Sequence, residues 1–231
     1  VGMKIASDWF DGRLGKALGY LVGALVLGSA FPHLLNHLGA DYQWQIVLHG
    51  TSLIAFLSGL AMLFFVGDGP SRIKSKSFSP KAALKIFQKK EFRWAAFGYF
   101  GHMWELYTLW AFLPLVLTYY AETTSEPLQI SLWTFLIMAF GVFGCVIGGF
   151  RSVSKGSAKV AYGFLLLSGL LCLISPLLYQ LSPSLFLALM CLWGFAVIGD
   201  SPQFSSLNAK YAPSELKGTA LTLAVSVGFF L

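Results

Sequence analysis

Charged residues are scarce in this sequence. Only 11% of its 231 residues are charged, while 56% are hydrophobic and the mean hydropathy is +0.70. In an ordinary soluble domain about a quarter of the residues are charged. A chain so poor in charge lacks the polar surface to cover itself in water. The composition therefore argues against a soluble domain, including one large soluble helical core.

Patterns for metal binding and catalysis are lacking too. The three cysteines are isolated from one another inside apolar runs, at positions 145, 172 and 191. An odd number without short spacing supports neither a disulfide framework nor a metal knuckle. His33, His37 and His49 are conceivable metal ligands, but they fall near solvated loop edges, so we expect no metal and no cofactor. There is no HExxH and no nucleophile elbow, so we do not expect an enzyme.

Long apolar runs dominate the chain instead. Six of them approach the ~20 residues that a helix needs to cross a bilayer. They cover residues 17–38, 45–66, 94–118, 129–150, 160–180 and 185–207, with partial runs at 1–10 and 218–231. The sequence therefore predicts an all-α, polytopic membrane protein. Because the chain opens on Val1 and stops at Leu231 inside apolar runs, we expect a fragment of a longer protein. In the first run, Gly19, Gly23 and Gly28 favour close packing on a partner helix.

Basic residues are missing from every second loop. All sixteen lysines and arginines lie in five places: 4–16, 72–93, 151–159, 210 and 217. If the runs are spans, these places share one side of the membrane, which the positive-inside rule makes the cytoplasmic side. The prediction puts 67–93, 151–159 and 208–217 in the cytoplasm and 39–44 and 121–128 outside. The net charge of +6 thus reflects topology, and no basic stretch is interleaved with exposed aromatics as nucleic-acid binding would require.

The longest polar stretch, residues 67–93, divides the chain. In its second half Leu84, Phe87 and Phe92 alternate with lysines, as in a basic amphipathic helix on the inner membrane surface. A calmodulin-type target helix would show the same pattern. We expect three parts: the end of an N-terminal bundle (1–66), a cytoplasmic linker with an amphipathic helix (67–93) and a C-terminal bundle (94–231).

Three junctions between the runs resemble one family. They are "WFDGRLGKALG" (9–19), "GGFRSVSKGSAKVA" (148–161) and "YAPSELKGTAL" (211–221). They resemble three junctions of the major facilitator superfamily. The first is similar to its junction of the fourth and fifth helices, the second to the gating motif between its eighth and ninth helices, and the third to its junction of the tenth and eleventh helices. The resemblance implies a fragment of a twelve-helix transporter with two bundles, here from the end of the fourth helix into the eleventh. An echo between "GKALGYLV" (15–22) and "GTALTLAV" (218–225) agrees with two related halves.

The resemblance also suggests roles for individual residues. In the gating loop it implicates Gly148, Gly149, Arg151 and Gly156, although Val153 stands about where the family usually has an aspartate. The first run lacks the glycine-proline pair of the family's antiporters. Within the superfamily, "GYFGHMWELY" (98–107) and "GDSPQFSSL" (199–207) look most like bacterial permeases of the nitrate/nitrite and cyanate types, without the glycine motif of true nitrate porters.

Two acidic residues, Glu105 and Asp200, lie deep inside predicted spans. An ionised carboxylate there costs at least ~2.5 kcal/mol on insertion scales, so it needs protonation, a partner or a water-filled cavity. Glu105 has no basic residue between Arg93 and Arg151, but His102 precedes it by one helical turn. We interpret Glu105 as a residue that takes up and releases a coupling proton, with His102 tuning it. A structural hydrogen bond between helices is the alternative.

Asp200 stands next to Gly199 and two positions before Pro202, which predicts a break in its helix. Transporters often place binding sites at such breaks, where Asp200, Ser201 and Gln203 would gather. A kink that only shapes the helix is the alternative. Three more candidates for the substrate path lie on the helix of Glu105: Trp104, Tyr107 and Thr108. For the aromatic residues, ordinary packing is the alternative.

These observations predict a secondary active transporter, a permease of the symporter type, in a bacterial inner membrane. It would move a small solute, an organic or inorganic anion, by alternating access coupled to protons. The expected partners are this solute, protons and membrane lipid, with no nucleic acid, and we expect a monomer. The alternative is a sensor or assembly subunit on a transporter scaffold that no longer moves solute, which Val153 in the gating motif favours.

Overall fold

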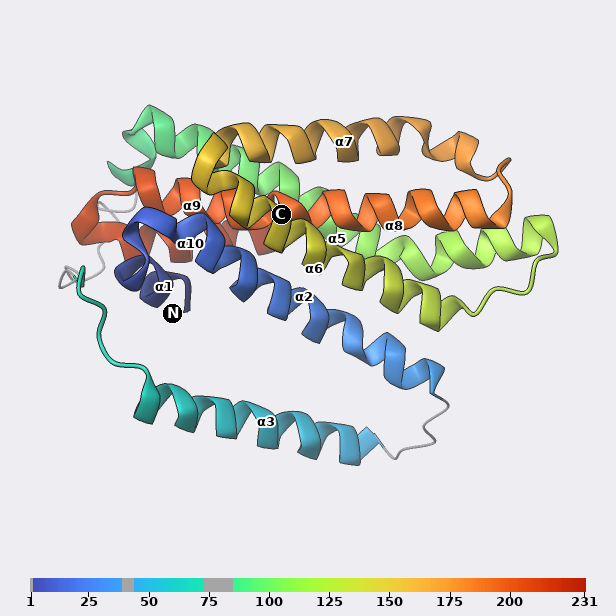
Figure 1. The fold of residues 1–231 in the computed structure, drawn as a ribbon, viewed down its shortest axis with the longest axis horizontal. Coiled ribbons are helices and arrows are strands. Elements are labelled where there is room, and N and C mark those ends of the chain that lie inside the picture. Colours follow the sequence, from blue (N-terminus) through green and yellow to red (C-terminus); the bar gives the residue numbers. More distant parts are fainter. Residues whose placement is uncertain (1, 39–43, 73–84) are drawn as a thin grey trace.

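The computed structural model describes residues 2–38, 44–72 and 85–231 of the chain. Almost all of these residues are helical, and the described ranges contain no strand. The helices, labelled as in Figure 1, are α1 (Gly2–Trp9), α2 (Leu14–His37), α3 (Trp44–Phe65), α5 (Lys90–Thr124), α6 (Ile130–Lys155), α7 (Ser157–Leu178), α8 (Pro183–Gly199), α9 (Ser201–Tyr211) and α10 (Lys217–Phe230). Short 3-10 turns, Asp11–Arg13 and Ser214–Leu216, precede α2 and α10. The all-α prediction is confirmed.

Five helical stretches of the described residues are long and apolar enough to cross a membrane. They are Leu14–His37, Leu48–Phe65, Ile130–Lys155, Ser157–Leu178 and Pro183–Tyr211. The remaining predicted run, 94–118, forms the middle of α5, which at 35 residues is the longest of these helices. α5 is less apolar than the other five stretches because it carries His102, Glu105 and several tryptophans and tyrosines.

The junction between α6 and α7 differs from the predicted loop. The sequence placed residues 151–159 between two spans, but α6 continues to Lys155 and α7 begins at Ser157. Gly156 alone makes the turn, with a positive φ of 81°, which a glycine adopts at little cost. Nothing before Gly156 breaks the helix, so three of the predicted gating-loop residues, Gly148, Gly149 and Arg151, are helical. Gly148 and Gly149 thus lie in the helix, as the predicted run 129–150 implied, whereas Arg151 is helical and not part of a loop.

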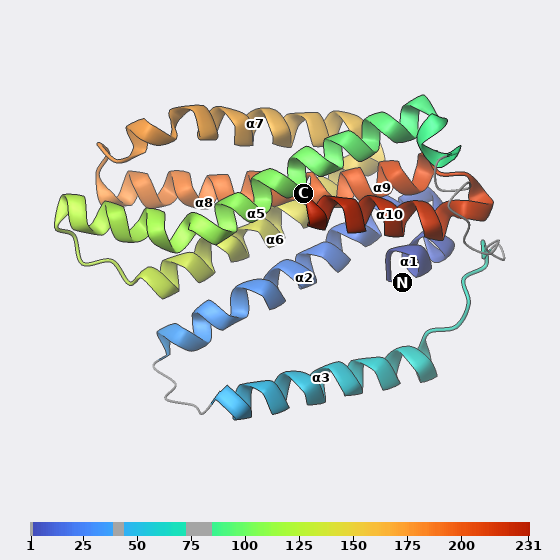
Figure 2. The same ribbon diagram turned by 180° about the vertical axis from the view of Figure 1, so that it is seen from behind.

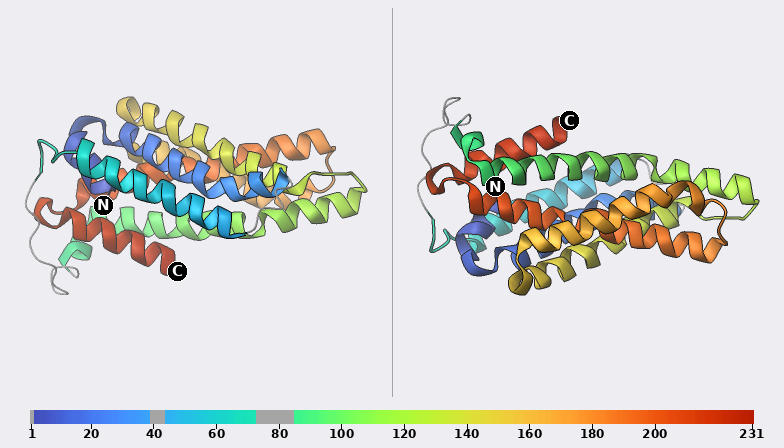
Figure 3. Two further views of the ribbon diagram at one scale, coloured as in Figure 1. Left: turned by 90° about the horizontal axis from the view of Figure 1, so that it is seen from below. Right: turned by 90° about the horizontal axis from the view of Figure 1, so that it is seen from above.

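The helices form an elongated bundle in which α2 packs along α6, and α6 packs along α8 on its other side (Figure 1). Views from below and above show the ends of α1, α9 and α10 gathered at one end of this bundle (Figure 3). α3 stands apart from the other helices in Figures 1 and 2, and none of its described side chains is buried. At the end of α1, Trp9 Nε1 donates a hydrogen bond to the Gly67 carbonyl at 3.1 Å, which ties this helix to the segment that follows α3.

Glycines bring α2 and α6 into close contact. A Cβ atom on Gly19 of α2 would lie 2.6 Å from the backbone carbonyl oxygen of Cys145, so no larger residue fits without a shift. A Cβ on Gly149 of α6 would lie 2.9 Å from the Gly15 carbonyl oxygen. Of the three glycines expected to serve close packing, Gly19 and Gly23 do so, whereas Gly28 faces open space.

The predicted amphipathic helix lies partly outside the described residues, since these resume only at Lys85. Phe92, expected on its apolar face, is fully buried in α5 beside the equally buried Ile86. The three described lysines of this segment are exposed: Lys85, Lys89 and Lys90. The division of the chain into two bundles and a linker stays a prediction.

Candidate functional site

A break between α8 and α9 positions Asp200. Pro202 has no backbone N–H, so the carbonyl of Ile198 loses the donor that an uninterrupted helix would supply. The Cys145 thiol of α6 approaches this carbonyl instead, with Sγ 3.5 Å from the oxygen. Beyond the break, the Asp200 carbonyl accepts the amides of residues 203 and 204, both at 2.9 Å, and α9 begins. The helix is therefore interrupted where the sequence predicted.

Asp200 meets His102 in the interior of the bundle. Asp200 Oδ1 lies 2.7 Å from His102 Nδ1, and the two side chains are 1% and 0% exposed. The distance is that of an ion pair, but the ring N–H is not aligned with the oxygen as a hydrogen bond requires. His102 Nε2 and Asp200 Oδ2 have no hydrogen-bond partner among the described residues. The imidazole and the carboxylate therefore form one compact, buried acid–base pair.

Glu105 lies one helical turn after His102 on α5 and is half-buried. Its Oε2 accepts a hydrogen bond from Ser168 Oγ of α7 at 3.3 Å, while Oε1 is buried without a hydrogen-bond partner among the described residues. Glu105 is within electrostatic range of both Asp200 and His102, and the indole N–H of Trp193 lies nearby without a well-aligned acceptor. α5, α7, α8 and the α8–α9 break thus bring three acid–base groups together. The sequence suggested His102 as the neighbour of Glu105, and the structure makes Asp200 the direct contact of His102.

The polar character continues along α9. Gln203 is fully buried, and neither its amide oxygen nor its amide nitrogen has a partner among the described residues. A Cβ on Gly15 would lie 3.3 Å from Gln203 Oε1 and would also touch Ser152, so this amide points to the contact of α2 with α6. Buried polar groups of this kind normally bind internal water. Ser201, at the start of α9, is also buried.

The residues expected along the substrate path fall into two sets. Ser201 and Gln203 are buried with Asp200, whereas Trp104, Tyr107 and Thr108 lie on the more exposed side of α5. Trp104 is 65% exposed. The Tyr107 ring packs against Trp110 and Phe229, with ring centroids 5.7 and 5.3 Å away. The two sets therefore lie in different environments, one buried and the other exposed.

Sequence reasoning missed several neighbours of the acid–base group. Ser168 is a single serine inside the apolar run "GFLLLSGLL", and that isolation was the one available signal. Trp193 is one of several tryptophans in the apolar runs and Cys145 is an isolated cysteine, so neither predicts a contact with this group. Their proximity depends on how α6, α7 and α8 pack around α5, which no local pattern encodes. Among the described residues, no three His, Cys, Asp or Glu side chains are placed to hold a metal ion.

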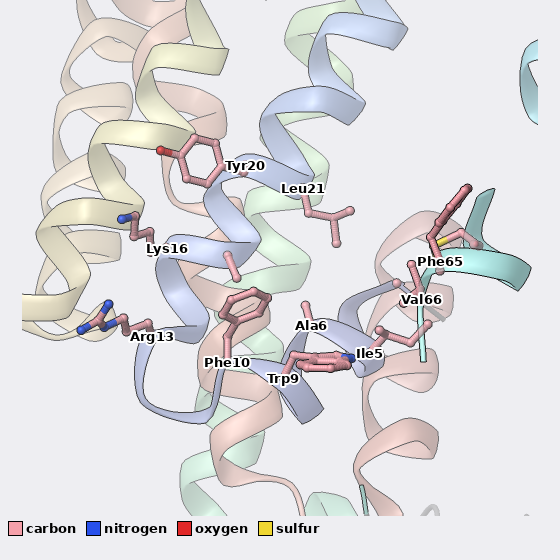
Figure 4. Close-up of a pocket in the computed structure, with 13 residues that line it drawn as sticks. Ile5, Ala6, Trp9, Phe10, Arg13, Lys16, Tyr20, Leu21, Phe65 and Val66 are labelled. Atoms are coloured by element: carbon pink, nitrogen blue, oxygen red, sulfur yellow. The ribbon is translucent and has the colours of Figure 1, made fainter. Parts of the chain in front are cut away.

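Two pockets lie away from this group. The larger, about 790 Å³, is lined mostly by apolar side chains of α1, the start of α2 and the end of α3. In the close-up, Trp9, Phe10 and Leu21 surround it, while the Lys16 side chain extends toward α6, where its Nζ lies 4.3 Å from the Phe150 ring centroid (Figure 4). The smaller pocket, about 510 Å³, is polar. Neither pocket is lined by His102, Glu105 or Asp200.

The family model described as Major Facilitator Superfamily matches residues 1–231. The chain belongs to the major facilitator superfamily. Comparison with curated proteins and with solved structures gave no match. Superfamily members are membrane transporters rather than enzymes, so this superfamily chain is an integral, multi-pass membrane protein of the transporter class.

Proposed function

We propose that this superfamily member is a proton-coupled secondary active transporter of a small anion in a bacterial inner membrane. The observation that carries the proposal is the acid–base group of Glu105, His102 and Asp200, held together by α5 and the α8–α9 break. Ionisable residues inside a membrane protein are costly, and they usually mark a path for protons or substrate. The resemblance of "GYFGHMWELY" and "GDSPQFSSL" to nitrate/nitrite- and cyanate-type permeases supports a small anion as solute.

Each residue of the group has a distinct part in this mechanism. The buried His102–Asp200 pair keeps a proton available without leaving a lone charge in a medium of low dielectric. Glu105, half-buried beside the pair, exchanges a proton with it or with water entering from one side. Gln203 extends the polar groups along α9 toward the cytoplasmic end, where water-mediated transfer can follow. Because Glu105 ionises only when water reaches it, proton release is tied to alternating access.

The decisive experiment replaces Glu105 by glutamine in the full-length protein. Glu105→Gln mimics a permanently protonated carboxyl with little change of shape. Nitrate, nitrite and cyanate are offered to proteoliposomes, and both counterflow and uphill uptake under an imposed pH gradient are measured. We expect counterflow to survive and uphill uptake to be lost. Glu122→Gln, an exposed glutamate in the last turn of the same helix, is the matched control and should retain both activities.

Other results would change the assignment. Normal uphill uptake by Glu105→Gln would remove this residue from the proton path. Loss of both activities in a folded variant would make Glu105 a substrate contact instead.

The second candidate is a sensor or assembly subunit that does not transport. Arg151 favours it, since this exposed residue has no ion-pair partner in the described part of the chain, and Val153 stands near the place of the usual aspartate. Proteoliposomes with the unaltered protein distinguish the two functions, because a sensor would catalyse no counterflow of any of the three anions.

A further inference from the structure

The smaller, polar pocket has the properties of an anion site. It lies at the end of the bundle where α1, α9 and α10 gather (Figure 3), on the side that the basic residues make cytoplasmic. Its volume is about 510 Å³. The lining comes from the start of α2, the α6–α7 turn, the last part of α9 and the start of α10.

Three cations line this pocket, and none of the described residues in its lining is acidic. They are Arg13, Lys210 and Lys217. None of the three forms an ion pair within the described ranges; Lys210 has only the Tyr211 ring beneath its ammonium, at 5.7 Å. Unpaired charges of one sign around a concave surface focus a positive potential there. The pocket therefore attracts anions.

Hydrogen-bond donors supplement the charge. α2, α7 and α10 all begin at the pocket, and none of them has a side-chain N-cap hydrogen bond. The first amides of such helices need acceptors, and anions are suitable ones. α6 and α9 end in the same place, so the helix dipoles partly cancel, and the three cations decide the sign of the potential.

A buried serine points independently to a ligand. Ser206 is only 8% exposed, lines the pocket and has no hydrogen-bond partner among the described residues. Its Oγ is open to the pocket rather than enclosed by protein, so an acceptor in the pocket can reach it. Ser152, in the same lining, already donates to the Gly149 carbonyl at 2.8 Å, so its hydroxyl oxygen remains available only as an acceptor. Ser206 thus has a hydroxyl free to donate to an anion, as do the more exposed Ser157 and Ser214 of the same lining.

We propose that this pocket binds a phosphoryl group, from either a soluble cytoplasmic phosphate compound or an anionic lipid headgroup. A phosphoryl group carries several acceptor oxygens and up to two charges, which suits one arginine, two lysines, a hydroxyl and free amides. The proposal goes beyond the transport function, since it does not depend on which solute is moved. A ligand here touches α2, α6, α7, α9 and α10 at once, and it therefore favours the arrangement in which these helices meet.

Binding to the purified full-length protein tests the proposal. Inorganic phosphate and pyrophosphate are the soluble probes, and calorimetry measures their affinity. Each lysine supplies a charge-assisted hydrogen bond, so Lys210→Gln and Lys217→Gln should each weaken pyrophosphate binding by about tenfold or more. Lys159→Gln is the matched control, because Lys159 is an exposed lysine on the same side that does not line the pocket. Equal weakening by the control would overturn the proposal, since it would indicate unspecific attraction.

Neighbouring serines supply a second comparison that leaves the charge unchanged. Ser206→Ala should weaken binding, whereas Ser205→Ala, at a buried serine outside the pocket, should not. The lipid source is tested in nanodiscs with phosphatidylglycerol or with phosphatidylcholine alone. In one outcome, phosphatidylglycerol raises the unfolding temperature of the protein while the soluble probes do not bind. If Lys210→Gln and Lys217→Gln abolish that rise, the result supports the site and identifies a lipid headgroup as its ligand. Absence of any effect of phosphate, pyrophosphate and phosphatidylglycerol would refute it.

Discussion

Gly19→Ala is the sharpest test of the packing between α2 and α6. The added methyl would lie 2.6 Å from the Cys145 carbonyl oxygen and 3.3 Å from the Gly149 Cα, and both are backbone atoms that no rotamer change can move. To lengthen the 2.6 Å contact with the carbonyl oxygen to an ordinary 3.4 Å, the helices must separate by about 0.8 Å (3.4 − 2.6). Overpacking of this kind typically costs about 1–3 kcal/mol.

Gly28→Ala is its matched control, because a Cβ at Gly28 has nothing within 4 Å. Both substitutions gain the same helix propensity, about 1 kcal/mol, so this gain cancels when the two variants are compared. The expected difference in unfolding free energy is therefore about 1–3 kcal/mol, with Gly19→Ala the less stable. At about 2–4 °C per kcal/mol for chains of this size, the midpoints should differ by about 2–12 °C.

The assay is thermal unfolding of the full-length protein in detergent, followed by intrinsic tryptophan fluorescence, with the two variants measured in parallel. If Gly19→Ala unfolds at the same temperature as Gly28→Ala or above it, the close contact between α2 and α6 does not exist as described.

Three further predictions concern the site and the topology. In a double-mutant cycle, His102→Ala and Asp200→Ala should together cost less than the sum of the single variants, with a coupling of about 0.5–3 kcal/mol; additive losses would show that the pair does not interact. Pro202→Ala restores a backbone donor to Ile198, so thermal stability should rise while the rate of counterflow falls, and an unchanged rate would dissociate the break from transport. A cysteine at the exposed Ser154, in a background without native cysteines, should react with an impermeant thiol reagent in inside-out vesicles only; labelling of intact cells would reverse the assigned orientation.

Much of the fold was predictable because the membrane imposes simple rules on a sequence. Apolar runs of sufficient length predicted the helices, and Gly199 before Asp200 with Pro202 two positions after it predicted the break. The α6–α7 turn falls within the predicted stretch 151–159, but it is confined to Gly156, because α6 continues through the charged residues to Lys155. A helix that emerges from the bilayer can carry charges without unwinding, and only Gly156 has the freedom to turn the chain.

The candidate site was predictable only in its parts. An acidic residue deep in a span is conspicuous, so Glu105 and Asp200 could be identified one at a time. Which of them contacts His102 could not be, since a helical turn places Glu105 near the imidazole by sequence while Asp200 reaches it through packing of α9 on α5. The isolated Ser168 likewise becomes informative only when α7 lies beside α5.

The acid–base group and the anion pocket share one helix, and this connects the two proposals physically. α9 begins next to Asp200, and its Gln203, Ser206 and Lys210 recur at spacings of three and four residues, so they lie on one side of the helix. Its eleven residues span only about 16 Å at 1.5 Å each. A phosphoryl group held by Ser206 and Lys210 therefore contacts the same short, largely buried helix whose other end presents the Asp200–His102 pair. Because packed interiors transmit strain, a ligand that fixes this end of α9 would also restrain the break on which the proposed proton transfer depends.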